Sequence, residues 1–101
     1  MNVGIAYSMT GVPIRLTHER LFHITENHPE LAGKAYDILE TIHSPDFIVQ
    51  GSYGEHLAVK RMNHVSLVVV YREGVDEGFV ITSFLTSKVD QLKKRTIVWP
   101  K

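Results

Sequence analysis

The chain has 101 residues, 11 basic and 11 acidic side chains, 44% hydrophobic residues and no cysteine. This length predicts a single domain over residues 1–101, and the composition excludes a disordered chain, a disulfide scaffold, thiolate metal sites and a cysteine nucleophile. The zero net charge argues against broad nucleic-acid binding, which usually shows as a basic domain.

The first expected element is a short strand at a sheet edge. Residues 1–11 carry two glycines and several polar residues, so we expect a loosely ordered lead-in there. Residues 12–16 then form the strand, because Pro13 lacks a backbone N–H and is tolerated only at an edge.

Two helices follow and meet at a corner. Thr17 can cap a helix over 18–27 with its hydroxyl. Pro29 cannot continue that helix but suits the first turn of the next one. Apolar residues at helical spacing predict a second helix from about 30 to 43 with one buried face.

Only strand signals follow the break at Ser44-Pro45-Asp46. Strands are expected over 47–50, 56–61, 65–71 and 79–85, then a turn or short helix over 86–94 and a short final strand over 96–99. Short connections make neighbouring strands antiparallel. The predicted fold class is α+β: two N-terminal helices on one face of a roughly four-stranded antiparallel sheet, with the other face free for solvent or a ligand.

No segment has the pattern of a membrane or targeting element. The chain start lacks a basic region followed by an apolar run, and the longest apolar run, 67–71, is far short of the ~20 residues of a membrane helix. The absence of cysteine fits a reducing compartment. We therefore expect a cytoplasmic protein without a membrane partner; the sequence leaves its oligomeric state open.

The basic residues are unevenly distributed. Lys60 and Arg61 are adjacent, and the last part of the chain is rich in cations: Lys88, Lys93, Lys94, Arg95 and Lys101. These are either ordinary solvated side chains or a basic patch beside the free sheet face.

Six histidines raise the question of a metal site. His18, His23 and His28 are five residues apart, and each step turns ~140° around a helix, so the three cannot converge on one ion. We expect neither a metal nor another cofactor. His23 and His28 remain candidate acid and base groups, because imidazole titrates near neutrality. The alternatives are a surface residue for His23 and, for His28, a corner residue that bonds a helix carbonyl.

Hydroxyl groups stand out in the strand over 79–85. Strict alternation places Thr82 and Ser83 on opposite faces. Thr82 becomes a candidate site residue if it shares a face with Arg61 or Lys60, but the sequence does not determine that register. Tyr71 could offer a hydroxyl or a stacking ring, although a core tyrosine is the commoner case.

Four segments together carry a resemblance: 16–31 with its His-Pro-Glu corner, the Ser44-Pro45-Asp46 break, the strand 67–71 and the Ile-Thr-Ser strand 79–83. They resemble the phage-associated nuclease families of the Barnase–EndoU–Colicin–RelE (BECR) superfamily, over about residues 14–99. The resemblance implies two helices before a four-stranded antiparallel sheet, and metal-independent RNA cleavage. It places the family's helix histidine on His23 or His28, its strand base on Arg61 or Lys60, and its strand hydroxyl on Thr82 or Ser83.

Two functions are consistent with this pattern. The first is a metal-independent ribonuclease, toxin-like or phage-related, with an RNA substrate and a protein inhibitor or antitoxin as partner. Its predicted catalytic residues are His23, His28, Arg61 and Thr82, with His28 the favoured histidine, and its predicted substrate-binding residues are Lys60, Tyr71, Ser83 and Lys88. The second is an inactive interaction domain of the same fold that binds a protein or RNA. A positive sheet face containing Arg61 and a histidine would favour the first, and a flat apolar patch the second.

Overall fold

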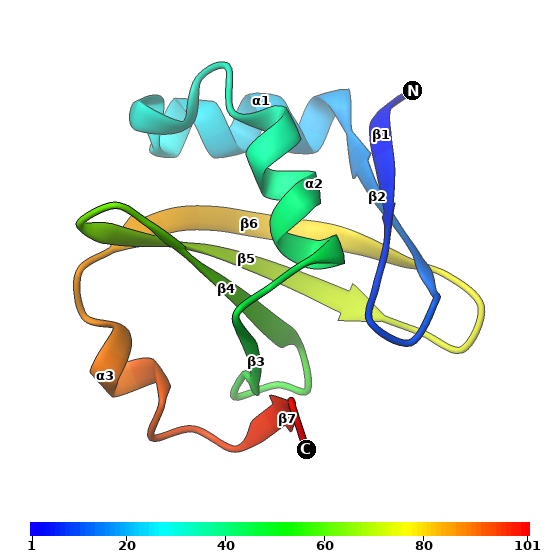
Figure 1. Ribbon diagram of the computed structural model, residues 1–101. Helices are drawn as coiled ribbons and strands as arrows, with labels where there is room; N and C mark the ends of the chain where they lie inside the picture. The colour runs from blue at the N-terminus through cyan, green and yellow to red at the C-terminus, as the bar shows by residue number, and fades with distance from the viewer.

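The computed structural model describes residues 1–101 and contains a seven-stranded sheet with three short α-helices (Figure 1). The strands are β1 (Asn2–Tyr7), β2 (Pro13–Thr17), β3 (Phe47–Gln50), β4 (His56–Met62), β5 (Val65–Glu73), β6 (Gly78–Thr86) and β7 (Ile97–Trp99). The helices are α1 (His18–Asn27), α2 (Ala35–His43) and α3 (Val89–Leu92), and a 3-10 turn, η1 (Pro29–Leu31), lies between α1 and α2.

The sheet is mixed, with the strand order β1-β2-β6-β5-β4-β3-β7. Strands β3 to β6 form the expected antiparallel meander. Strand β2, however, runs parallel to β6. The expectation of two helices on a four-stranded antiparallel sheet is therefore wrong in the number of strands and in the type of sheet.

The strands at the two ends of the sheet account for the difference. Strand β1 occupies the sheet edge and forms a hairpin with β2, so the expectation of a loosely ordered lead-in over residues 1–11 is wrong. Strand β2 lies between β1 and β6, so the expectation of an edge strand over residues 12–16 is also wrong. Pro13 is paired with Tyr7 at the turn end of this hairpin, where the missing proline N–H removes little of the pairing. Strand β7 returns to pair with β3. Such pairings between distant segments leave no local periodicity in the sequence.

Helix α1 has the expected bounds, and the Thr17 hydroxyl accepts the Arg20 N–H at 3.1 Å as its cap. The second expected helix is divided in two. Gly33 has a φ of +78°, which a right-handed helix cannot contain, so the 3-10 turn ends before it and α2 begins only at Ala35. No helix combines the length and the apolar character needed to cross a membrane.

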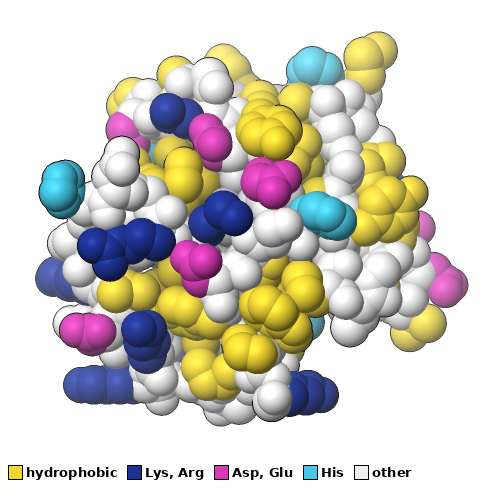
Figure 2. All heavy atoms as spheres, in the orientation of Figure 1, with side chains coloured by type: hydrophobic (Ala, Val, Ile, Leu, Met, Phe, Trp, Pro, Cys, Tyr) yellow, Lys and Arg dark blue, Asp and Glu magenta, His cyan; other side chains and the backbone are white.

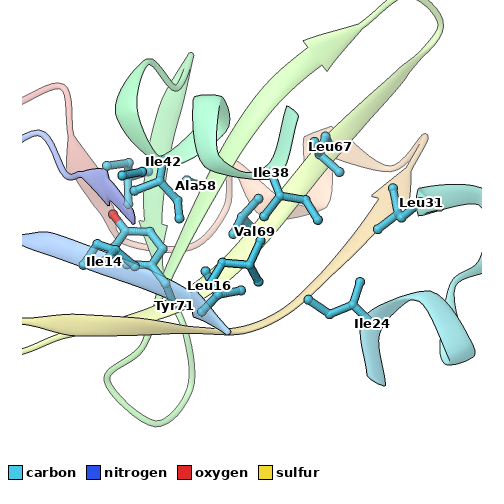
Figure 3. Packing of buried hydrophobic residues seen from close by; sticks show 13 residues of the cluster. Ile14, Leu16, Ile24, Leu31, Ile38, Ile42, Ala58, Leu67, Val69 and Tyr71 are labelled. Carbon is cyan, nitrogen blue, oxygen red and sulfur yellow. The ribbon is translucent and has the colours of Figure 1, made fainter. Parts of the chain in front are cut away.

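The main core lies between α1, α2 and one face of the sheet, here called the α1/α2 face (Figure 3). Ile24 of α1 and Ile38 of α2 are buried against this face, where Leu67 and Val69 of β5 are also buried.

A smaller cluster occupies the opposite face, here called the α3 face. It consists of Val49, Leu57, Val59, Val68 and Val70, and Val89 and Leu92 of α3 pack against it. Figure 1 shows α3 on the side of the sheet away from α1 and α2. The expectation of a face without helices is therefore wrong, because the basic segment after β6 crosses it.

We predict that Gly78→Ala destabilises the protein more than Gly4→Ala does. A Cβ at Gly78 would overlap the Arg72 backbone carbonyl and would lie 2.7 Å from Ile14 Cδ1, where β2, β5 and β6 meet. A Cβ at Gly4 would meet only the end of the Leu39 side chain, at 2.6 Å, which can rotate away. Overpacking of this kind costs about 1–3 kcal/mol. Urea unfolding measures both variants, and equal midpoints would contradict the prediction.

Candidate nucleic-acid interface

Strand β6 has an open edge beyond Phe79. Strand β2 pairs with β6 only at Gly78 and Phe79, so the rest of β6 has a neighbouring strand on one side alone. Helix α1 contacts β6 and ends at Asn27. The next residue, His28, contacts Phe84 with 6.3 Å between ring centroids. Phe84 is paired with Val68 and packs on the α3 face, so His28 reaches that face around the edge of β6.

The structure fixes the position of His28 mainly through the backbone. Its N–H donates to the Ile24 carbonyl at 2.8 Å, and its side chain is 34% exposed. Its Nδ1 lies 3.6 Å from Glu30 Oε2, which is too long for a hydrogen bond. The carboxylate lies on the Nδ1 side of the ring, so Nε2 is the ring nitrogen away from Glu30.

His23 has a different environment. Its side chain is 63% exposed, and Nδ1 lies 4.0 Å from Glu26 Oε1 on the same helix. Its ring contacts that of Phe22, which is also exposed. The structure therefore does not bring His23 and His28 together, and only His28 contacts the sheet.

The β4–β5 register places Lys60 and Arg61 on opposite faces. Lys60 is paired with Leu67 on the α1/α2 face, and its Nζ donates to the Ser44 carbonyl at 2.6 Å. Arg61 is paired with Ser66 and belongs to the α3 face. Lys60 therefore does not share a surface with His28.

The Arg61 side chain is exposed and is oriented by the following turn, because its Nε donates to the Asn63 carbonyl at 2.6 Å. Across the sheet, Arg61, Ser66 and Thr86 form one row of paired residues. Thr82 lies on the same face but four residues further along β6, which is about 13 Å of strand. The structure therefore does not bring Arg61 and Thr82 into one pair.

The sequence analysis missed Arg72, a cation that is closer along the strands to Thr82 than Arg61 is. Arg72 lies two residues, or about 7 Å, along β5 from Val70, which is paired with Thr82. Its Nη2 donates to the Tyr53 carbonyl at 3.2 Å. Alternation along β5 puts Arg72 on the face of Val68 and Val70. Whether Thr82 shares that face depends on the register of β6, which the sequence does not give.

A carboxylate accompanies Arg72. The pKa of Glu55 is lowered by backbone hydrogen bonds from its own N–H and that of Tyr53, and then by the positive charges of Arg72 and Arg95. Glu55 therefore stays ionised and balances part of the positive charge at this end of the α3 face.

Two other predicted substrate-binding residues lie elsewhere. The Ser83 side chain is fully buried and donates to the Val68 carbonyl at 2.7 Å, which is a structural role. Tyr71 is fully buried in the main core, where burial and the charge of Glu73 raise the pKa of its phenol, so it stays neutral. Neither side chain is available to a substrate on the α3 face.

Cations and aromatic rings occur together on the α3 face. Figure 2 shows Lys and Arg side chains gathered on the side of the molecule that carries α3 and the β4–β5 turn in Figure 1. A cavity of about 320 Å³ between α3 and the sheet is lined by Arg61, Ser66 and Lys93. The Lys93 ammonium lies 5.8 Å from the centre of the Phe47 ring. Lys88 is exposed just before α3, and its N–H donates to Thr86 Oγ1 at 3.0 Å.

The face therefore combines half-buried and exposed rings with cations, and it is neither uniformly positive nor a flat apolar patch. No three His, Asp or Glu side chains lie close enough to hold a metal ion. Comparisons of the chain with protein-family models, with curated proteins and with solved structures found no match.

Proposed function

We propose that this protein is a cytoplasmic, metal-independent ribonuclease that binds single-stranded RNA along β6 on the α3 face. The observation that supports this most directly is the contact of His28 with Phe84, on the face that also carries Thr82, Arg61 and Arg72. We call these five residues the β6 surface. The sequence resemblance to BECR nucleases points to the same reaction and to a toxin-like or phage-related role.

The proposed reaction needs only groups present on the β6 surface. The 2′-hydroxyl of RNA attacks the adjacent phosphorus, and the bond from phosphorus to the 5′-oxygen breaks, leaving a 2′,3′-cyclic phosphate. His28 accepts the 2′-hydroxyl proton at Nε2, and the protonated ring gives a proton to the departing 5′-oxygen. An arginine guanidinium, from Arg61 or Arg72, stabilises the charge that develops on the phosphoryl oxygens. Where Arg72 is that arginine, the Thr82 hydroxyl is close enough along the sheet to donate a hydrogen bond to the same phosphate.

The combination of aromatic rings and cations supports a single-stranded substrate. Phe79 is 43% exposed on β6, and Phe84 is partly exposed beside His28. Unpaired bases can stack on such rings while arginines bind the phosphates. The neutral net charge implies few phosphate contacts and therefore a shallow dependence of binding on salt.

An inactive interaction domain remains the second candidate, and a separate surface favours it. Ile5 and Tyr7 on the edge strand β1 are 49% and 57% exposed, and Tyr36 on α2 is 75% exposed. These three side chains line a shallow cavity of about 320 Å³. Exposed apolar groups beside an unpaired strand edge are typical of protein-binding surfaces. A protein partner bound there would leave the β6 surface open.

The test is incubation of the purified protein with mixed-sequence single-stranded RNA in EDTA. We expect cleavage that leaves 2′,3′-cyclic phosphate ends, because the proposed nucleophile belongs to the substrate. An RNA of the same sequence with 2′-O-methyl groups is the matched control and should remain intact. Cleavage that EDTA abolishes and Mg²⁺ restores would identify a metal enzyme instead. Absence of cleavage of any RNA would favour the interaction domain.

A further inference from the structure

A second cavity lies on the α1/α2 face, across the sheet from the β6 surface. Its volume is about 400 Å³. Ile48, His56 and Tyr71 contribute to it from three neighbouring strands, Trp99 from β7, and Met9 from the turn between β1 and β2. Small-molecule sites span roughly 300–1,000 Å³ and are mostly apolar with a few polar groups, so this cavity has the size and the lining of such a site.

His56 is a polar residue of the cavity lining whose ring makes no hydrogen bond within the protein. His56 Nδ1 is inaccessible to solvent and makes no hydrogen bond within the protein. The ring itself is held edge-on to Tyr71, with centroids 5.3 Å apart and an angle of 84° between the planes. The other ring nitrogen, Nε2, also makes no hydrogen bond within the protein but is not shut off from solvent, so it is the His56 nitrogen that a ligand in the cavity can bond.

Glu73 supplies a second polar group. One carboxylate oxygen, Oε2, accepts a hydrogen bond from the Thr10 hydroxyl at 2.5 Å, which anchors the side chain beside the β1–β2 turn. The carboxylate forms no ion pair with a basic side chain of the protein, so Oε1 can accept a hydrogen bond from a ligand. This oxygen favours a ligand with an N–H donor, and Lys101, which also lines the cavity, balances the charge of the carboxylate.

We propose that this cavity, the Trp99 pocket, binds a planar heteroaromatic molecule with polar ring edges, such as a nucleobase. The faces of such a ring suit the indole and the aliphatic lining, and an N–H on its edge can donate to Glu73 while another edge atom pairs with His56 Nε2. A purely aliphatic ligand would leave Glu73 Oε1 and His56 Nε2 without a partner. The inference is independent of the proposed ribonuclease activity, because Glu73 and Arg72 are adjacent strand residues and lie on opposite faces.

Trp99 is the single tryptophan of the chain, so its fluorescence reports on this pocket directly. We expect a saturable change on titration with at least one of adenosine, guanosine, cytidine and uridine, and a thermal midpoint that rises with the concentration of that nucleoside. Ribose and cyclohexanol, which lack the heteroaromatic ring, should have no effect. A 2′-O-methyl RNA oligomer is titrated in the same way. If it binds at a lower concentration than the nucleoside does, the natural ligand of the pocket is a base of an RNA chain and not a free nucleoside.

Two variants and two matched controls test the assigned contacts. Glu73→Gln and His56→Ala should each weaken nucleoside binding by roughly 10-fold or more, as expected for loss of a hydrogen bond to a charged or buried group. Asp76→Asn and His64→Ala make similar changes at exposed turn positions and should bind as the parent does. Glu73→Gln preserves the shape of the side chain, so it remains decisive if His56→Ala does not fold. No saturable change with any nucleoside or the oligomer up to millimolar concentration, an equal response to cyclohexanol, or unchanged affinity in Glu73→Gln would overturn the proposal.

Discussion

Replacing His28 with alanine is expected to lower the rate of RNA cleavage by about 100-fold or more, since a positioned acid–base group typically contributes at least that factor. His28 is the histidine that contacts Phe84 on the α3 face, and its backbone N–H is held by the Ile24 carbonyl. The measurement is the single-turnover rate on one defined RNA in EDTA. When the protein is in saturating excess over the RNA, a lower rate reports a slower chemical step and not weaker binding.

His23→Ala is the matched control, because it removes the same side chain from an exposed position on the same helix. We expect full activity in this variant. Both variants should unfold close to the parent temperature, since the hydrogen bond that ends α1 comes from the backbone N–H of His28 and survives in alanine. Loss of activity in His23→Ala with full activity in His28→Ala would reverse the assignment. If neither variant changes the rate, the histidine mechanism is wrong and Thr82 is the next group to test.

The parts of the fold that could be predicted from the sequence have local causes. Thr17 sets the start of α1 through its own hydroxyl, and Pro29 prevents α1 from continuing, so both ends of that helix were predictable. The four strands of the meander follow from short apolar runs between turn residues. The parallel pairing of β2 with β6 was not predictable, because the two strands are joined by most of the chain and neither carries a local signal for the other.

The second expected helix was predicted as continuous because the periodic pattern does not register a single interrupting residue. The apolar spacing continues through Gly33 and predicts one helix from about 30 to 43. A positive φ at Gly33 interrupts it, and Leu31 is buried from a 3-10 turn instead. Periodicity reports which side chains face the core, but not whether the backbone between them is continuous.

Strand register, and not residue type, decides which of the candidate site residues share a face of the sheet. The corner position of His28 was predictable, because it follows from Pro29. Strict alternation does not predict which face Thr82 lies on, because β6 contains a β-bulge. Tyr71 is paired with Val80 and Val70 with Thr82, so Ile81 is an extra residue in β6. This bulge puts Val80 in the main core and Thr82 on the α3 face, although they are two residues apart. The same lack of register information left Lys60 and Arg61 as alternatives and concealed Arg72.

The largest expected loss of stability is that of Ile38→Ala. Ile38 has no exposed surface and lies between α2 and β5, close to Leu67 and Val69 in the main core (Figure 3). Removing its side chain takes apolar surface out of the core and leaves a cavity, which costs about 2–5 kcal/mol. Alanine favours the helix slightly more than isoleucine does, so helix propensity offsets only a small part of this cost. Urea unfolding should show a much lower midpoint with an unchanged slope.

Tyr36→Ala is the control on the same helix, since this side chain is 75% exposed. We expect its free energy of unfolding to stay within about 0.5 kcal/mol of the parent, as is usual for surface substitutions. The comparison tests which side of α2 faces the sheet, because both changes place alanine in the same nine-residue helix. Equal midpoints for the two variants would mean that Ile38 is not packed in the core. The packing of α2 on β5 would then be incorrect, and with it the assignment of the main core to the α1/α2 face.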